Sequence, residues 1–274
     1  MRLGIDIGGT TINMGLVDSA SIIKRASAPS FKPDATLNQT IDHLYALIDE
    51  HICPEVKSIG IGVPSVVDTV NGIVYNAANI PSWTEVHLKK AMESRYGIPV
   101  AVNNDANCFA LGAAGEFGCR EGEILVGVTL GTGVGIGVVA DGKVLNGRNT
   151  GVGELTWFPL NGKPMEQYCS KSFFLEKGSE PSEFFNRAEA GDPEAIALFE
   201  EYGRNLAMVM MLVISAYDPD HIVFGGGISH SHKYFEAPML EALAAQFPYP
   251  ESLKQLRISY LPQSEAAITG ASLL

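Results

Sequence analysis

The sequence is poor in cysteine and contains no long apolar run. It has four cysteines, and none of them stands in a Cys-x-x-Cys pair or beside a group of histidines: Cys53, Cys108, Cys119 and Cys169. This spacing predicts neither a disulfide framework nor a zinc site. No stretch is long enough to cross a bilayer, and no basic segment leading into an apolar one precedes the first strand. We therefore expect a soluble, cytoplasmic protein.

Basic residues are also scarce. The chain of 274 residues has 19 Lys and Arg against 31 Asp and Glu, which gives a formal net charge of −12 at pH 7. Nucleic acids and anionic membranes are bound mainly through clustered Lys and Arg, and no such cluster occurs. Neither is expected as a partner. An anionic ligand such as a nucleotide would have to be held by backbone N–H groups, helix N-termini and a metal ion.

What the sequence does contain is a regular alternation of strand and helix patterns, with 46% hydrophobic residues, enough for a substantial core. This alternation predicts the α/β class. The expected strands are 3–7, 12–17, 22–28, 58–63, 100–102 and 222–224, with two glycine-rich strands within 122–140. The expected helices are 34–51, 84–96, 104–117, 165–177, 182–190, 193–217 and 264–274, and 146–164 is expected to be a loop.

Two segments of the chain echo each other. The sequence GIDIGGTTINMGLVD at positions 4–18 and the sequence GVTLGTGVGIGVVAD at positions 127–141 share a strand, a Gly/Thr turn and a second strand. A repeat of this kind predicts two related lobes. The alternative is a pair of unrelated hairpins in a glycine-rich protein.

The two Gly/Thr turns have a chemical use. Glycine lets the backbone approach a phosphate closely, and Thr hydroxyl and N–H groups donate to phosphate oxygens. Two such turns facing each other would grip a polyphosphate from both sides. The copies differ where Asp6 in the first corresponds to Thr129 in the second. A carboxylate in the first turn could hold Mg²⁺, directly or through water, whereas a second carboxylate would add repulsion.

Three motifs, in this order, resemble the phosphate-1, phosphate-2 and adenosine motifs of the actin-like ATPase superfamily: Asp6–Thr10, Leu130–Gly133 and Val223–Ile228. Within that superfamily the sequence is similar to the ROK group of sugar kinases and repressors. The similarity runs nearly from end to end through shorter motifs: Ile61–Pro64, Asn79–Trp83, Asn103–Asn107, Gly153–Glu154 and Gly270–Ala271. Each motif alone is weak, but their order and spacing together are specific.

The resemblance implies a two-lobed, actin-like ATPase fold of the ribonuclease H-like α/β type, with the active site in the cleft between the lobes. A small lobe would comprise residues 1–118 and 263–274, and a large lobe residues 119–262. The implied activity is transfer of the γ-phosphoryl group of ATP to a sugar hydroxyl with the help of Mg²⁺. The resemblance also implies self-association, with a homodimer as the expected form.

The resemblance further assigns the residues of the site. Asp105 would be the base that accepts the hydroxyl proton, and the alternative is that it is a helix N-cap or a first-turn acid. Sugar contacts are implied for Asn79, Asn104, Glu154 and Glu166, although Glu166 could simply be a first-turn acid. Asp6 would organise Mg²⁺. The phosphates would be held by Gly8, Gly9, Thr10, Thr11, Gly131, Thr132 and Gly133, and the adenosine by Gly225, Gly226 and Gly227. His230 and His232 are expected to be exposed at a helix start.

The sequence departs from the family in one region. Most members read G-E-x-G-H, followed by cysteines that bind structural zinc, whereas this chain reads Gly153-Glu154-Leu155-Thr156-Trp157. Zinc is therefore predicted to be absent and Cys169 to be a lone buried thiol, with the loop ordered by apolar contacts of Trp157, Phe158 and Tyr168. The histidine is a sugar ligand in the family, and Trp157 would offer an indole face and one N–H donor instead.

Ser65 and Ser82 also stand where many relatives have glycine, so we expect a shift in sugar specificity. The sequence is thus interpreted as an ATP-dependent kinase acting on the primary hydroxyl of a hexose, with glucose first, then N-acetylmannosamine, another amino sugar or fructose. The alternative is an inactive sugar-binding regulator. Repressors of the group carry an N-terminal helix-turn-helix, and this chain begins at the first phosphate strand, which disfavours direct DNA binding.

Overall fold

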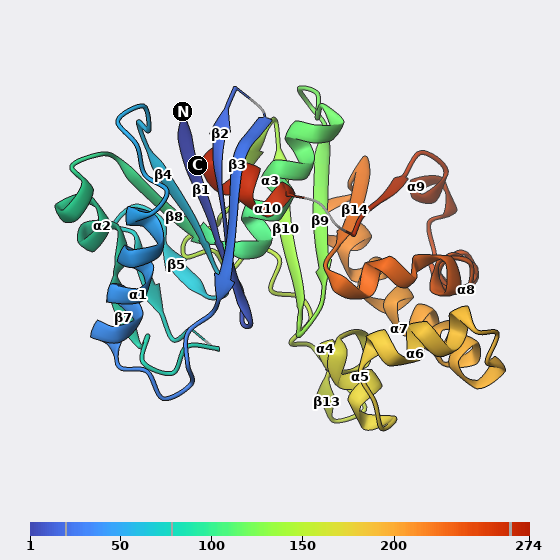
Figure 1. The fold of residues 1–274 in the computed structure, drawn as a ribbon. Helices are drawn as coiled ribbons and strands as arrows, with labels where there is room; N and C mark the ends of the chain where they lie inside the picture. The colour runs from blue at the N-terminus through green and yellow to red at the C-terminus, as the bar shows by residue number, and fades with distance from the viewer. Residues whose placement is uncertain (20, 78, 263–264) are drawn as a thin grey trace. The chain divides into compact units, whose positions relative to one another are not determined.

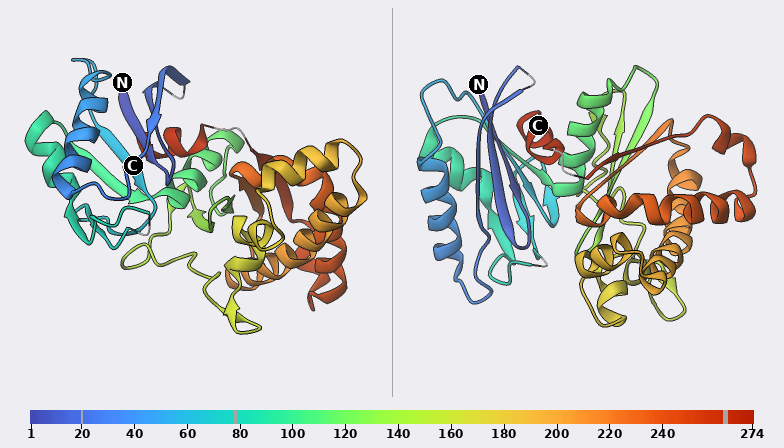
Figure 2. Two further views of the ribbon diagram at one scale, coloured as in Figure 1. Left: turned by 60° about the horizontal axis from the view of Figure 1, so that its bottom comes forward. Right: turned by 45° about the vertical axis from the view of Figure 1, so that its right-hand side comes forward.

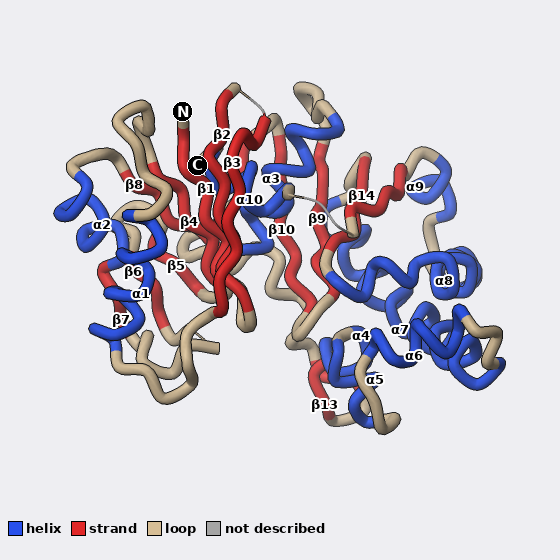
Figure 3. The backbone as a smooth tube through the Cα atoms, in the orientation of Figure 1, coloured by secondary structure: helices blue, strands red, loops and turns tan. Residues whose placement is uncertain are grey.

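A computed structural model describes residues 1–274 except 20, 78, 263 and 264 (Figure 1). The chain divides into two compact units. Unit 1 comprises Met1–Gly118, Gly137–Val152 and Glu265–Leu274, and unit 2 comprises Cys119–Ile136 and Gly153–Ser264. Each unit contains both strands and helices (Figure 3), so the expected α/β class is confirmed.

Unit 1 contains a five-stranded sheet in the order β3-β2-β1-β4-β8. Strand β1 runs antiparallel to β2 and parallel to β4, and β4 runs parallel to β8. A second, antiparallel sheet has the order β5-β6-β7. The bounds are β1 (Arg2–Ile7), β2 (Thr11–Asp18), β3 (Ser21–Pro29), β4 (Ile59–Val63), β5 (Val66–Asp68), β6 (Ile73–Tyr75), β7 (Glu85–His87) and β8 (Val100–Asn104).

Helices α1 (Leu37–Asp49) and α2 (Leu88–Tyr96) pack on the core of unit 1. A capping box starts α1, because Thr36 and Gln39 each accept a backbone hydrogen bond from the other residue. The helix buries Thr40, Leu44 and Ile48, which are four residues apart and so share one face. The fully buried indole of Trp83 donates to the Thr40 hydroxyl at 2.7 Å.

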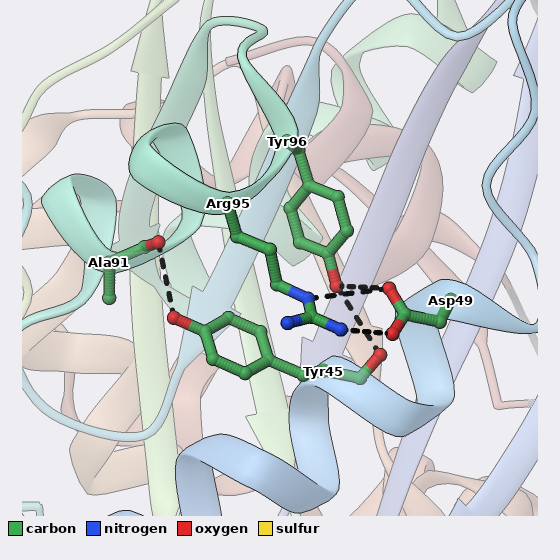
Figure 4. Close-up of polar contacts among 5 residues, drawn as sticks. All are labelled: Tyr45, Asp49, Ala91, Arg95 and Tyr96. Carbon is green, nitrogen blue, oxygen red and sulfur yellow. Dashed lines mark hydrogen bonds and ion pairs between the residues drawn. The ribbon is translucent and has the colours of Figure 1, made fainter.

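Polar contacts also link α1 to α2 (Figure 4). The Tyr45 hydroxyl donates to the Ala91 carbonyl at 3.2 Å, and the Tyr96 hydroxyl donates to Asp49 Oδ1 at 3.0 Å. The Arg95 guanidinium pairs with the Asp49 carboxylate and lies 4.5 Å from the centre of the Tyr45 ring. The hydrogen bond from Arg95 lowers the pKa of Asp49. These contacts hold the C-terminal part of α1 against α2.

The second five-stranded sheet has the order β11-β10-β9-β14-β15. Its strands are β9 (Ile124–Leu130), β10 (Val134–Ala140), β11 (Lys143–Val144), β14 (His221–Gly225) and β15 (Arg257–Leu261), with β14 parallel to both β9 and β15. Counted along the chain, both sheets have the order third, second, first, fourth, fifth. The internal repeat predicted from the sequence is therefore confirmed, and the alternative of two unrelated hairpins is wrong.

The boundary between the units falls within β10. Residues 137–152, expected in the large lobe, group with unit 1. The reason is packing on α3 (Asp105–Phe117): a Cβ on Gly137 would lie only 2.3 Å from the Ala106 carbonyl oxygen. Residues 263 and 264, expected to begin the last segment of the small lobe, lie outside the described residues.

Unit 2 is completed by a short hairpin and a group of helices: β12 (Pro159–Leu160), β13 (Lys163–Pro164), α4 (Glu166–Cys169), α5 (Lys171–Glu176), α6 (Pro181–Glu189), α7 (Pro193–Tyr217), η1 (Gly227–Ser231), α8 (His232–Gln246) and α9 (Pro250–Lys254). The aromatic rings of Phe174, Phe199 and Tyr202 pack at centroid distances of 5.1 Å and are fully buried. No helix in the described ranges has the length and apolar character needed to cross a membrane.

Several expected elements differ from the structure. The expected helix 84–96 begins with strand β7 and becomes helical only at Leu88. The expected helix 165–177 is broken at Ser170, whose hydroxyl caps a new helix by accepting from Ser172 N. Helix α8 and strand β15 were not predicted. Helix α8 contains Pro238 and has little separation of polar and apolar faces, so its pattern is weak.

The C-terminal helix α10 (Ala266–Ser272) packs against α3, β1 and β4 within unit 1 (Figure 2). The two helices approach so closely that a Cβ on Gly112 would lie 1.9 Å from the Ala266 carbonyl oxygen. On the same helix α3, a Cβ on Gly115 would meet nothing nearer than 3.8 Å. Glycine is therefore required at position 112 but not at position 115.

We predict that Gly112→Ala lowers the free energy of unfolding by about 2 kcal/mol, because the added methyl group forces α3 and α10 apart. Gly115→Ala is the matched control. It should be neutral or stabilising by about 0.5 kcal/mol, because alanine has a higher helix propensity than glycine. Urea unfolding of the two variants measures both effects. Equal stability of the two variants would contradict the packing described here.

Candidate functional site

The first group of predicted residues lies where β1 ends. The turn after β1 is closed by Gly8 N, which donates to the Thr11 carbonyl at 2.9 Å. The Ser30 hydroxyl donates to the Gly8 carbonyl at 2.8 Å and fixes the turn from β3. Gly9, Thr10 and Thr11 remain exposed. A Cβ on Gly9 would lie 3.2 Å from Asn79 Nδ2, so Asn79 lies directly against this turn.

Asp6 stands in the middle of the sheet, one residue before the end of β1. It pairs across the strands with Asn13 in β2 and with Gly62 in β4, and it is partly buried. Burial raises its pKa from 3.8 to about 6, and a hydrogen bond with Asn13 opposes part of this shift. A carboxylate is a good ligand for Mg²⁺, and a bound cation would favour its charged form. Asp6 thus fits the metal-organising role on chemical grounds.

Asp105 is the first residue of α3, directly after β8. The cap of this helix is Asn104, whose side-chain oxygen accepts from Ala106 N at 2.9 Å and from Asn107 N at 3.2 Å. The N-cap role that was the alternative for Asp105 therefore belongs to Asn104. Asp105 itself is an acid of the first turn, and its Oδ1 accepts from Ala106 N at 2.9 Å.

Gly62 separates Asp6 from Asp105. A Cβ at position 62 would lie 3.5 Å from the Asp105 Cα and 3.1 Å from Cys108 Sγ. The Cys108 thiol is fully buried, and its pKa is raised first by burial and then by the charges of Asp6 and Asp105. Asp6 and Asp105 therefore both lie near Gly62 and Cys108, toward the carboxyl ends of the parallel strands β1, β4 and β8.

Asn104 is also tied to the loop after β4. Its amide nitrogen donates to the Ser65 carbonyl at 3.3 Å, and the Ser65 hydroxyl donates to the Tyr75 carbonyl. In the first turn of α3, the Asn107 amide donates to Asn103 Oδ1 at 3.0 Å, and both of these residues are buried. The start of α3 is thus held by side-chain hydrogen bonds on several sides, which restricts the position of Asp105.

The second group of predicted residues lies in unit 2, around the turn between β9 and β10. Gly131 N donates to the Gly133 carbonyl at 3.0 Å, with the exposed Thr132 between them. Glu166 Oε2 accepts from Val134 N at 3.0 Å, and it lies 2.6 Å from the place that a Cβ on Gly133 would take. The carboxylate of Glu166 therefore contacts the turn directly, in addition to its place in the first turn of α4.

Glu154 and Trp157 form a pair in unit 2. The indole N–H of Trp157 donates to Glu154 Oε2 at 3.1 Å. Glu154 is exposed as a residue, but partial burial of its carboxyl group raises its pKa, and the charge of Glu166 raises it further. The hydrogen bond from Trp157 opposes this shift. A backbone hydrogen bond from Glu166 N to the Thr156 carbonyl at 3.0 Å joins the two chain segments that carry Glu154 and Glu166.

The expected apolar ordering of the loop by Trp157 and Phe158 is wrong, because these side chains are 63% and 59% exposed. Backbone hydrogen bonds order the loop instead, for example from Met165 N to the Phe158 carbonyl at 2.9 Å. The Cys169 thiol is fully buried and free, as predicted, and burial raises its pKa. Within the described part of the chain, no three His, Cys, Asp or Glu side chains are grouped to hold a metal.

The glycine-rich motif after β14 lies beside the end of β9. Gly225 pairs with Thr129 across the two strands, and a Cβ on Gly226 would lie 2.4 Å from the Leu130 carbonyl oxygen. Gly226 also has a φ of 82°, which favours glycine. A cavity of about 440 Å³ opens here, lined by residues of both motifs, among them Gly131, Thr132, Phe185, Gly227, Ile228 and His230. Its volume is in the range of small-molecule sites.

The expectation that both histidines are exposed is wrong. His230 is partly buried and lines the cavity. The ring of His232 stacks on Tyr260 with centroids 4.3 Å apart, because strand β15, which the sequence pattern did not reveal, supplies that aromatic neighbour.

Two charged residues of the cavity were missed: Lys171 and Glu180, whose side chains form an ion pair at 2.9 Å. The sequence pattern predicts one continuous helix over 165–177, with Lys171 inside it. Ser170, a residue type that favours N-caps, was the available signal that a new helix begins there.

The predicted site residues thus form two groups, each within its own unit. Unit 1 brings together Asp6, the turn of Gly8, Gly9, Thr10 and Thr11, and also Asn79, Asn104 and Asp105. Unit 2 brings together the turn of Gly131, Thr132 and Gly133, the motif of Gly225, Gly226 and Gly227, and also Glu154, Trp157 and Glu166.

Comparison with known proteins adds a family match. A family model described as ROK family matches residues 2–274. The sequence is 33% identical over 259 residues to the N-acetyl-D-glucosamine kinase of Erwinia tasmaniensis, covering 84% of this chain and 85% of the relative. It is 28% identical over 314 residues to the glucokinase of Halalkalibacterium halodurans, covering 99% and 94%.

Among solved structures, a ROK family glucokinase from Streptomyces griseus in complex with glucose and AMPPNP is similar to this chain. The TM-score is 0.82 at 26% identity, and the match covers 99% of this chain and 97% of that one.

We predict that Asp6→Asn raises the free energy of unfolding at pH 7 by about 2 kcal/mol, somewhat less than the pKa shift alone would give, because Asp6 keeps some contact with solvent. The folded-state pKa of Asp6, about 6, exceeds the ordinary 3.8, so the charged form is disfavoured in the fold. In wild type, the contribution of the protonated Asp6 carboxyl to the free energy of unfolding is therefore fully present below about pH 4. It is lost as the pH rises through 6. Urea unfolding at pH 4 and pH 7 should show a gain for the variant that grows with pH.

Asp49→Asn is the control with the opposite sign, because Arg95 lowers the pKa of Asp49 in the folded state. That variant should be less stable than wild type at pH 7. A gain for Asp6→Asn that is the same at both pH values would show that the carboxyl of Asp6 is not held in a desolvating position.

Proposed function

Because the chain belongs to the ROK family, we propose that it is an ATP-dependent kinase that phosphorylates the primary hydroxyl of a hexose. The observation that carries the proposal is the placement of Asp6 and Asp105 around Gly62 at the ends of three parallel strands. Phosphoryl transfer needs a group that accepts the hydroxyl proton and charge stabilisation at the phosphates. These two carboxylates, both beside Gly62, are suited to the two tasks.

Asp105 is the proposed general base. It would accept the proton of the sugar hydroxyl as the oxygen attacks the γ-phosphorus. Asp105 directly follows the N-cap Asn104 at the start of α3, which restricts the position of its carboxylate. Asp6 would hold Mg²⁺, which when bound neutralises charge on the phosphates. The raised pKa of Asp6 fits this role, because burial leaves the ionised carboxylate without a compensating positive charge and a bound cation would supply one.

The nucleotide is proposed to bind through main-chain groups. The turns Gly8–Thr11 and Gly131–Gly133 would donate N–H groups to the phosphates, and Gly225, Gly226 and Gly227 would lie along the adenosine. The cavity beside Gly131 and Gly227 supports this assignment, since one hollow is lined by both motifs. Main-chain binding also suits a chain with net charge −12, which carries few basic side chains.

The sugar is proposed to contact Asn79, Asn104, Glu154, Trp157 and Glu166. Carboxylates accept from two neighbouring hydroxyls at once, and an exposed indole face packs on the C–H groups of a pyranose. Glucose is the proposed first substrate, followed by N-acetylated amino sugars and fructose. The names of the relatives, glucokinase and N-acetyl-D-glucosamine kinase, support a pyranose of this type.

We predict that Asp105→Asn lowers kcat by a factor of about 10² to 10⁴, the usual contribution of a general base. Sugar binding should stay within about twofold of wild type, because asparagine has the same shape and still hydrogen-bonds. A coupled assay for ADP release measures kcat, and calorimetry measures sugar binding. A wild-type protein that binds sugar but releases no ADP with any hexose would instead be an inactive sugar-binding regulator.

We further predict that Trp157→Ala raises the KM for the preferred sugar about tenfold, because the sugar loses the indole face and Glu154 loses its hydrogen bond. Phe158→Ala is the matched control: this neighbouring aromatic side chain is similarly exposed and should change KM by less than about twofold. Rates with glucose, N-acetylglucosamine, N-acetylmannosamine and fructose would be compared. Equal effects of the two variants on every sugar would rule out a contact between Trp157 and the substrate.

A further inference from the structure

An ion pair lies at the cavity of unit 2. The Lys171 ammonium is 2.9 Å from Glu180 Oε1, and both residues line the cavity of about 440 Å³ that also contacts the turn Gly131–Gly133 and the motif at Gly227. Lys171 is the first residue of α5, and Glu180 directly precedes α6. The side chains are 37% and 51% exposed, so both can exchange partners with a ligand in the cavity.

The backbone fixes Lys171 beside the phosphate turn. Lys171 N donates to the Gly131 carbonyl at 2.8 Å, which ties the first residue of α5 to the turn itself. The Ser170 hydroxyl accepts from Ser172 N at 3.3 Å and starts the helix at this point. The backbone of Lys171 is therefore held beside the turn, and its ammonium can reach a phosphate group bound at Gly131 and Thr132.

Charge gives this lysine a particular importance. The chain has a net charge of −12, and of the side chains that line the cavity within the described residues, Lys171 is the only lysine or arginine. A nucleoside diphosphate or triphosphate carries several negative charges. Hydrogen bonds between an ammonium and a phosphate oxygen are among the stronger ones in proteins. Without Lys171, the cavity would offer Glu180 alone as a charged neighbour.

We propose that Lys171 binds a phosphate group of the nucleotide and that Glu180 holds the ammonium in place until the phosphate replaces it. This inference rests on the proposed function, which puts the nucleotide in this cavity. A partly exposed ion pair contributes only about 0–1 kcal/mol, so giving up the contact with Glu180 costs little. The gain is a charge-assisted hydrogen bond to an oxygen that carries more charge than a carboxylate oxygen.

The test compares ADP with adenosine by calorimetry in wild type and in Lys171→Met. We expect ADP to bind about tenfold more weakly to the variant, the loss of one charge-assisted hydrogen bond, whereas adenosine should bind within about twofold of wild type. Lys177→Met is the matched control. Lys177 lies just after the same helix and pairs with Glu201 at 3.4 Å, but it does not line the cavity. ADP binding should not change in this control.

Glu180→Gln separates phosphate binding from a structural role of the ion pair. If the pair only braces α5 against α6, its loss should weaken ADP binding as much as Lys171→Met does, and the proposal is overturned. If Lys171 binds phosphate, Glu180→Gln should bind ADP at least as tightly as wild type, because the ammonium no longer has to leave a carboxylate. Thermal unfolding of each variant verifies that it is folded.

The remaining outcomes distinguish this inference from the function on which it rests. Wild-type affinity of Lys171→Met for ADP, or an equal loss for ADP and adenosine, contradicts the role of Lys171 and leaves the kinase proposal intact. Failure of the wild-type protein to bind either ADP or adenosine contradicts the nucleotide assignment of the cavity and therefore both proposals.

Discussion

The candidate site of unit 1 depends on the close packing of α3 against the parallel strand β4, which glycine at position 62 favours. A Cβ there would lie only 3.1 Å from Cys108 Sγ, which is a tight contact, and 3.5 Å from the Asp105 Cα, which is ordinary van der Waals contact. At the same place, burial of the Asp6 carboxyl raises its pKa to about 6. The fold therefore accepts an energetic cost at this point, and a cost of this kind is common where a protein binds a cation or performs proton transfer.

For the proposed kinase activity, this acidic chain has to hold the phosphates of a nucleotide with few basic side chains. The structure has two glycine-containing turns with exposed backbone and threonine groups, and it repeats the same strand order in two sheets. The repeat is not symmetrical in its chemistry, since Asp6 has Thr129 as its counterpart. In the proposed function Asp6 alone would hold the metal ion, and Thr129 adds no second carboxylate.

Much of this was predictable from the sequence, and the failures have physical causes. The actin-like ATPase fold expected from the motifs is confirmed, and the repeat was visible because strand and turn patterns are local. The loop after Glu154 was misjudged because aromatic residues suggested burial, whereas Trp157 is exposed and hydrogen-bonded. Lys171 was missed because helical periodicity runs through the break at Ser170, and its partner Glu180 lies just before the next helix, α6. Long-range pairs of this kind leave no periodic signal in a sequence.

The central claim is that Asp105 accepts the proton of the sugar hydroxyl. A crystal structure with ADP, Mg²⁺ and the preferred sugar tests it most directly, by the distance between the Asp105 carboxylate and the primary hydroxyl oxygen of the sugar. The account predicts a distance of about 2.6–3.2 Å. A sugar bound with its primary hydroxyl away from Asp105 and in contact with a different base would contradict it.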